Sequence, residues 1–82
     1  MATHRLSEFR YLLQHWDQGD CRFEEVVECG VSLLPNGVED LAREFQVADS
    51  TIGRWINGVA RPAPRLKHLI VGFLRQKLLS GE

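Results

Sequence analysis

The stretch Val38–Asn57, with the sequence VEDLAREFQVADSTIGRWIN, decides the fold of this chain. Its apolar residues recur at intervals of three and four positions, which is the spacing of one face of an α-helix. They fall into two short runs, Leu41, Ala42 and Phe45 followed by Ile52, Trp55 and Ile56. Gln46 and Val47 stand between the runs. The stretch therefore predicts two short helices joined by a tight turn, a helix-turn-helix.

Ala42 has the small side chain that a close crossing of two helices requires. Larger apolar residues can then fill the wedge between the helices, which gives a role to Leu41, Phe45, Val47, Ile52 and Trp55. Nearly every apolar position of the stretch is therefore accounted for by packing.

Several of these positions also match a known motif in order and in spacing. They are Leu41, Ala42, Phe45, Val47, Ile52, the run Arg54–Gly58, and Arg61 with Pro62. The segment resembles the DNA-binding motif of the lambda-repressor-like (Cro/C1, or XRE) regulators, and the resemblance covers about residues 36–70. It implies that the second helix lies in the major groove of DNA. One position departs from the family, because the turn usually has glycine, which favours a positive φ, and this chain has Gln46.

The formal net charge of −1 conceals a segregation of charge along the chain. Residues 1–40 carry three arginines against eight acids, whereas residues 41–82 carry five arginines and two lysines against three acids. No acid occurs between Thr51 and Gly81, a segment with six basic residues, Arg54, Arg61, Arg65, Lys67, Arg75 and Lys77. Because phosphate binding normally requires a basic surface, the half that holds the motif is the half suited to DNA.

The length of 82 residues predicts one domain, which we expect to be an all-α, compact bundle of about five helices. Its parts are two acidic N-terminal helices, the helix-turn-helix and a C-terminal helix, over residues 1–35, 36–58 and 63–80. The first helix is expected from about Thr3 to Asp17, with Gly19 ending it. Asp20 can cap the second helix, which Pro35 stops.

The helix ends of the motif have candidate capping residues. Asn36 is expected to cap the first motif helix, with Glu39 as its partner in a capping box. Asp49 is a better cap than Ala48 for the second helix, because a carboxylate can accept hydrogen bonds from the exposed backbone donors. Gly58 follows the end of that helix.

Outward positions near the start of the second motif helix are the candidates for base contacts, namely Asp49, Ser50, Thr51 and Arg54. Arg54 is the leading base reader, because its planar fork can bond guanine at two acceptors, although a phosphate contact is the alternative. Asp49 would act mainly as a cap, or accept from a cytosine amino group. Ser50 and Thr51 could instead serve only the start of the helix.

Phosphate contacts are expected around the motif, from Asn36, Gly37, Asn57, Arg61, Arg65 and Lys67. For Asn57 and Arg61 the resemblance implies this role, because they match positions that often hold phosphates in the family. Val38 is apolar where relatives often present a polar residue to DNA, which removes one contact. We expect Arg75 and Lys77 on a solvated face. Trp16 and Trp55 follow helical core spacing and are expected in the core rather than stacked on bases.

The C-terminal helix has a wider apolar arc than a small monomer needs. The arc could belong entirely to the core, or part of it could pair with a second copy through Leu69, Phe73, Leu74 and Leu78. A symmetric dimer would read two half-sites about one DNA turn (~34 Å) apart.

Other functional classes lack their sequence signatures. The phosphate-binding loop GxxxxGK[ST], HExxH and GxSxG do not occur, so we do not expect an enzyme. Cys21 and Cys29 are expected to be free thiols, and we predict neither a metal nor a cofactor. No apolar run is long enough to span a membrane, and the N-terminus lacks the apolar core of a signal peptide, so a cytoplasmic location is expected.

The sequence thus predicts a homodimeric transcriptional regulator of a prokaryote or phage, a repressor that binds a palindromic operator in double-stranded DNA. The alternative is a protein-interaction adaptor or antitoxin-like protein, which would bind its partner through the acidic N-terminal helices and use the helix-turn-helix only as a scaffold. The acid-free basic segment favours DNA binding, because an adaptor would not need it.

Overall fold

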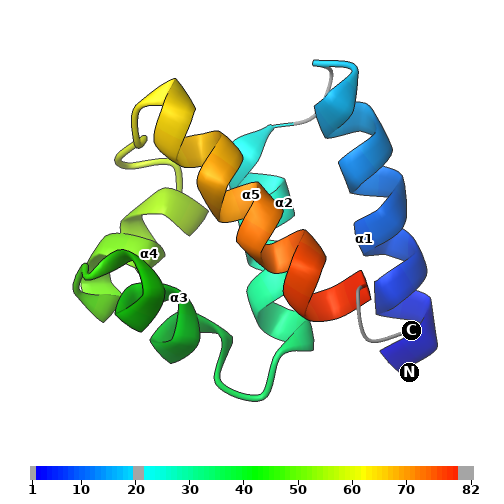
Figure 1. The fold of residues 1–82 in the computed structure, drawn as a ribbon, viewed down its shortest axis with the longest axis horizontal. Helices are drawn as coiled ribbons and strands as arrows, with labels where there is room; N and C mark the ends of the chain where they lie inside the picture. The colour runs from blue at the N-terminus through cyan, green and yellow to red at the C-terminus, as the bar shows by residue number, and fades with distance from the viewer. Residues whose placement is uncertain (1, 20–21, 80–82) are drawn as a thin grey trace.

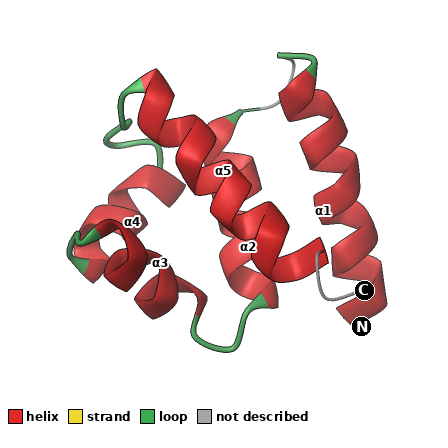
Figure 2. Cartoon of the chain, in the orientation of Figure 1, coloured by secondary structure: helices red, strands yellow, loops and turns green. Residues whose placement is uncertain are grey.

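The computed structural model of the chain describes residues 2–19 and 22–79 (Figure 1). The described residues form five α-helices and no strand, which confirms the predicted all-α fold (Figure 2). The helices are α1 (Ala2–Asp17), α2 (Phe23–Leu33), α3 (Gly37–Phe45), α4 (Asp49–Ile56) and α5 (Pro64–Leu79). No helix in these two ranges is long and apolar enough to cross a membrane.

Helix α2 is the centre of the molecule, because it contacts each of the other four helices. In Figure 1, α5 crosses α2, while α1 lies on one side and the pair α3 and α4 on the other. Gly30 of α2 makes the crossing close: a Cβ atom there would lie 2.9 Å from Leu74 Cδ1 and 3.2 Å from Phe9 Cε1. The missing side chain therefore leaves room for α1 and α5 on the same central helix.

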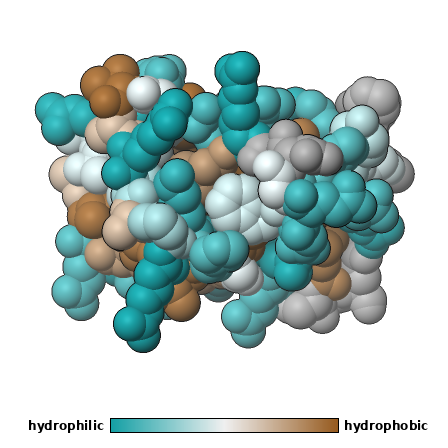
Figure 3. All heavy atoms as spheres, turned by 90° about the horizontal axis from the view of Figure 1, so that it is seen from above, coloured by the Kyte–Doolittle hydropathy of each residue, from teal (hydrophilic) through white to brown (hydrophobic). Residues whose placement is uncertain are grey.

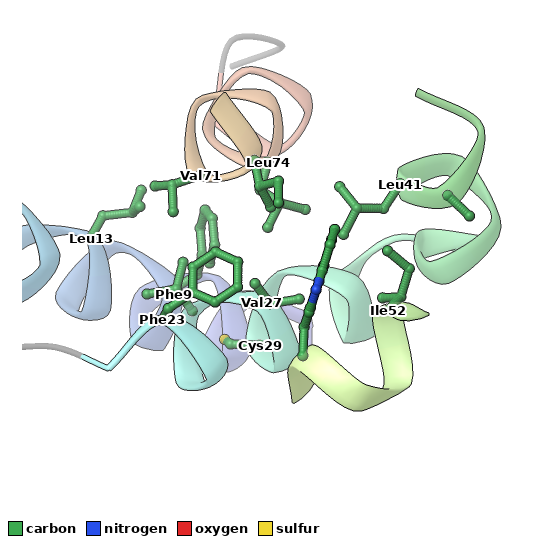
Figure 4. Packing of buried hydrophobic residues seen from close by; sticks show 13 residues of the cluster. Phe9, Leu13, Phe23, Val27, Cys29, Leu41, Ile52, Val71 and Leu74 are labelled. Carbon is green, nitrogen blue, oxygen red and sulfur yellow. The ribbon is translucent and has the colours of Figure 1, made fainter. Parts of the chain in front are cut away.

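The hydrophobic core receives buried side chains from all five helices (Figure 4). Phe9, Leu41, Ile52, Ile70 and Leu74 are completely buried. The N-terminal helices are therefore part of the same domain as the motif, because Phe9 and Ile52 belong to one apolar cluster.

The two tryptophans differ in burial. Trp55 is buried, as its spacing predicts, and its ring centroid lies 6.3 Å from that of Phe23. Trp16 is only partly buried and packs against the edge of the core, with its ring 6.2 Å from Phe23 and 5.4 Å from His68. The prediction of a core position is thus confirmed for Trp55, and Trp16 keeps an accessible edge.

The predicted capping residues of α3 and α4 do not form the expected side-chain hydrogen bonds. Asn36 does occupy the position before α3, but its backbone (φ −128°, ψ 50°) is outside the extended region usual for a cap, and its side chain forms no capping hydrogen bond. The capping box with Glu39 is therefore absent. Ala48, not Asp49, precedes α4, because Ala48 is extended and its carbonyl accepts from the Thr51 amide at 3.0 Å. Asp49 is the first helical residue, where its charge still suits the helix dipole.

The residue before α2 also differs from the expectation. Arg22 occupies that position and makes no side-chain capping hydrogen bond. The proposed cap Asp20 lies outside the described residues, as does Cys21.

The turn between α3 and α4 has the backbone conformation that usually selects glycine. Gln46 has φ 56° and ψ 46°, in the left-handed region, and no other described residue except Gly19 and Gly58 has a positive φ. The amides of Gln46 and Val47 both donate to the carbonyl of Ala42. These bonds end α3 and direct the chain into α4 after three residues.

Replacing Gln46 with glycine should stabilise the protein by about 1 kcal/mol, because glycine adopts a positive φ without steric cost. Urea unfolding followed by circular dichroism would measure the change. Gln14, an exposed residue inside α1, is the matched control, and Gln14→Gly should cost about 1 kcal/mol. A loss of stability in both variants would contradict the strain assigned to the turn.

Helix α5 uses most of its apolar arc within the domain. Ile70, Val71 and Leu74 are buried, and Phe73 and Leu78 are partly buried against the core. Leu74 therefore cannot contact a second copy in this fold, which corrects the proposed dimer interface. Leu74 is buried because α5 crosses α2 and this side chain packs on Gly30 of α2.

Cys29 is a free thiol buried between α1 and α2, where its Sγ lies 3.8 Å from the carbonyl oxygen of Arg5. Burial raises the pKa of this thiol, because the thiolate is poorly solvated there. The raised folded-state pKa means that the thiol contributes stability below its unfolded pKa of about 8.5, and that this contribution is lost at higher pH.

In a Cys21→Ser background, we therefore expect stability to fall as the pH rises above about 8.5. Cys29→Ala in the same background should show a shallower decline in urea unfolding over the same pH range. Parallel pH profiles for the two proteins would refute the role of Cys29.

Candidate nucleic-acid interface

Helix α4 is anchored by one face and exposed on the other. Ile52 and Trp55 are buried at 0% and 5% exposure and fix the helix against α2 and α3. The opposite side presents Asp49, Ser50 and Arg54 as exposed residues, with Thr51 partly buried beside them. All four predicted base-contact residues are thus on one short helix, but Thr51 is less accessible than the rest.

The chain after α4 is fixed by backbone hydrogen bonds. Gly58 adopts φ 74°, and its amide donates to the Trp55 carbonyl at 3.2 Å. The amides of Val59 and Ala60 both donate to the carbonyl of Arg54, at 2.9 and 3.3 Å. This is the Schellman motif, in which a glycine in the left-handed conformation reverses the chain so that the amides after the helix donate to its last carbonyls. The loop that leads to Arg61 is therefore held against the end of α4.

The arginines divide into paired and unpaired groups. Arg5 lies 2.8 Å from Glu8, and Arg75 lies 3.0 Å from Asp17. In contrast, the guanidinium groups of Arg54, Arg61 and Arg65 have no ion pair or hydrogen bond with any residue in the described ranges. These three groups are all exposed. An external anion could therefore bind them without displacing an internal partner.

The Arg75 side chain is 44% exposed, as expected for a solvated face, and it also forms a surface ion pair. Its Nη2 atom donates to both carboxylate oxygens of Asp17 at 3.0 Å and ties α5 to α1. Lys77 lies with its Nζ atom 5.6 Å from the Phe73 ring centroid. Both residues are in the C-terminal half of α5, far in sequence from the exposed face of α4. Arg75 also has an acidic partner within the protein.

The predicted phosphate contacts do not all gather in one place. Asn57, Arg61 and Arg65 are exposed and lie from the end of α4 to the start of α5. Asn36 is also exposed, but the start of α3 lies at the bottom of Figure 1, away from the α4–α5 loop at the upper left. Gly37 is buried against α2.

Gly37 is a packing residue, which corrects its assignment as a phosphate contact. A Cβ atom there would lie 2.6 Å from Val31 Cα and would also meet the Val31 carbonyl oxygen. The start of α3 therefore packs directly against the backbone of α2. The sequence did not indicate this, because glycine after asparagine is equally typical of an exposed turn.

A hollow of about 250 Å³ lies next to the same loop, and sequence reasoning missed it. Its lining is contributed by α1, α2, α5 and the loop, through Trp16, Arg22, Phe23, Glu24, Arg61 and Lys67. Lys67 is only partly exposed, with Nζ 5.8 Å from the Phe23 ring centroid. No local signal could reveal a hollow whose walls come from four separate segments.

Val59 is a second surface feature that the sequence did not indicate. It is 76% exposed in the loop between Arg54 and Arg61. Figure 3 views the molecule from above Figure 1 and shows mainly hydrophilic side chains on that face, with smaller apolar areas between them. The loop thus combines the exposed apolar residue Val59 with the unpaired cation Arg61.

Comparison of the chain with protein-family models, with curated proteins and with solved structures found no match. The functional assignment therefore depends on the exposed face of α4 and the unpaired cations beside it.

Proposed function

We propose that this protein binds double-stranded DNA sequence-specifically, with α4 in the major groove. The observation that carries the proposal is the anchored helix α4 whose outward face and following loop expose Arg54, Arg61 and Arg65 without acidic partners among the described residues. The phosphates of DNA would supply the anionic partners that these arginines lack within the described residues. The resemblance of residues 36–70 to lambda-repressor-like regulators supports the same function.

The outward face of α4 and the segment that follows it would contact different parts of the DNA. Asp49, Ser50 and Arg54 would face base edges, and Arg54 would contact guanine through two hydrogen bonds. Arg61 and Arg65 would bind phosphates and fix the position of the helix in the groove. The hydrogen-bonded loop after α4 supports this task, because a fixed loop loses little entropy when it binds.

The simplest regulatory mechanism is repression by a homodimer that occupies a palindromic operator. Leu69 is 55% exposed on α5, and Phe73 and Leu78 are partly exposed, so these residues remain available to a second copy. A dimer would place two copies of α4 on half-sites about one DNA turn apart. The location that follows from this function is the cytoplasm of a prokaryotic cell.

Selection of random duplex DNA by the purified protein, repeated at low and moderate salt, tests the proposal directly. A palindromic motif, together with a dimeric mass in solution, would support it. Failure to enrich any sequence, or binding that disappears at moderate salt, would refute sequence-specific recognition.

Two arginine variants should separate base reading from phosphate binding. Arg54→Ala should relax the preference at one position of each half-site, at a cost of about 1–3 kcal/mol for the preferred base. Arg61→Ala should weaken all sequences alike and reduce the salt dependence by about one counterion. Lys77→Ala, which removes a cation near the other end of α5, is the control and should leave binding unchanged. An Arg54→Ala protein with unaltered site preference would contradict the assignment.

The adaptor function through the acidic N-terminal helices has less support. Phe9 and Leu13 of α1 are buried in the core. Two acids of α1, Glu8 and Asp17, are paired with Arg5 and Arg75. Part of the acidic character of this surface is thus neutralised within the protein.

A further inference from the structure

The hollow beside the α4–α5 loop combines aromatic walls with cationic groups. Trp16, which is partly exposed, contributes the accessible aromatic surface, and the buried ring of Phe23 lies behind it with its centroid 6.2 Å from that of Trp16. Arg61 and Lys67 contribute positive charge from the loop and from α5, and Arg22 adds a third cation against the single acid Glu24. A ligand that fits this lining has a flat apolar body and an anionic group.

The hollow is small and open to solvent. About 250 Å³ is slightly less than the ~300–1,000 Å³ of sites that hold drug-sized molecules. A single aromatic ring with a phosphate or carboxylate is of suitable size. A bare inorganic anion would leave the surface of Trp16 uncovered, and a neutral aromatic molecule would leave Arg61 and Lys67 without an anionic partner.

Arg61 and Lys67 are both available to such a ligand. The guanidinium of Arg61 is exposed and has no acidic partner within residues 2–19 and 22–79. Lys67 interacts with the face of Phe23 but has no ion pair in those ranges. The anionic group of a ligand could contact both cations while its aromatic ring packs against Trp16.

We propose that this hollow binds a small aromatic anion, and that the bound anion opposes DNA binding by occupying Arg61. The second half of the proposal rests on the proposed function, in which Arg61 holds a DNA phosphate. The Arg61 guanidinium would be the shared group, because the ligand anion in the hollow and a DNA phosphate would compete for it. The ligand would then act as an inducer that releases the operator.

Phenyl phosphate is a suitable probe for the hollow, with inorganic phosphate and phenol as its two halves. Binding would be followed by ¹H–¹⁵N NMR of the full chain, using the indole N–H signal of Trp16 assigned with Trp16→Phe. We expect saturable shifts of Trp16 and Lys67 with phenyl phosphate, and affinities at least about tenfold weaker for either half alone. Equal affinity for inorganic phosphate, or shifts that do not saturate, would overturn the site.

Matched lysine variants test the charge requirement. Lys67→Gln should weaken phenyl phosphate binding about tenfold, because it removes a charge-assisted contact. Lys77→Gln makes the same change on the same helix outside the hollow and should leave the affinity unchanged. Identical affinities for the two variants would overturn the role of Lys67 in this site.

The effect on DNA is measured separately, by titrating selected operator DNA with and without saturating phenyl phosphate. We expect operator affinity to fall about tenfold, and the same concentration of inorganic phosphate to have a much smaller effect. Binding of phenyl phosphate with unchanged operator affinity would overturn the inducer mechanism and leave the ligand site standing. Absence of DNA binding would refute the proposed function, whereas the NMR titration would still decide the ligand site.

Discussion

Phe9→Ala should lower the free energy of unfolding by about 3–5 kcal/mol, which is a large part of the stability of a domain this small. The Phe9 side chain is completely buried and reaches the crossing of α1, α2 and α5, near Gly30 and Leu74. Its removal would lose apolar burial and leave a cavity that the surrounding helices could fill only in part.

Tyr11→Ala is the matched control for Phe9, because it truncates an aromatic residue of the same helix that is 60% exposed. Its effect should remain within about 0.5 kcal/mol. Urea unfolding followed by circular dichroism and by tryptophan fluorescence would measure both variants. Similar stabilities for Phe9→Ala and the unmodified protein would show that α1 is not part of the cooperative core.

The result also bears on function. If α1 were an independent arm for a protein partner, its truncation would leave the unfolding of the remaining helices unchanged. Because Phe9 and Ile52 belong to the same apolar cluster, we expect one transition that shifts as a whole. The proposed DNA binding by α4 should then weaken at temperatures where the Phe9 variant unfolds.

Gly37→Ala should destabilise the protein by about 2–3 kcal/mol, although alanine is the better helix former. The added Cβ would overlap the backbone of Val31, including its Cα at 2.6 Å. Backbone atoms inside a packed helix cannot move aside as a flexible side chain can. Relief of the overlap would require α3 to move away from α2, and α4 would move with it because the two helices are in contact.

Gly72→Ala is the control for this substitution. Gly72 is exposed in α5, and a Cβ there would meet no atom within 4 Å, so the change should stabilise the protein by about 0.5–1 kcal/mol. Opposite signs for the two glycine variants are therefore the expected result. A stabilising effect of Gly37→Ala would contradict the close contact between α2 and α3.

The helices and the exposed face of α4 could be predicted from the sequence. The spacing of Leu41, Ala42, Ile52 and Trp55 records which side of each helix is buried, and the structure buries all four residues. The positive φ at Gln46 was implied by the resemblance to the lambda-repressor-like motif, in which this turn position is usually glycine. Each of these features depends on residues within a few positions of one another.

Features that join distant segments were decided only by the tertiary structure. The pairing of Arg75 with Asp17, the burial of Leu74 and the close contact at Gly37 all depend on how helices far apart in sequence pack together. The hollow beside the loop has the same origin. The sequence by itself thus determined the helices and their apolar faces, because local periodicity reflects burial, whereas packing decided which surfaces and charges remained free.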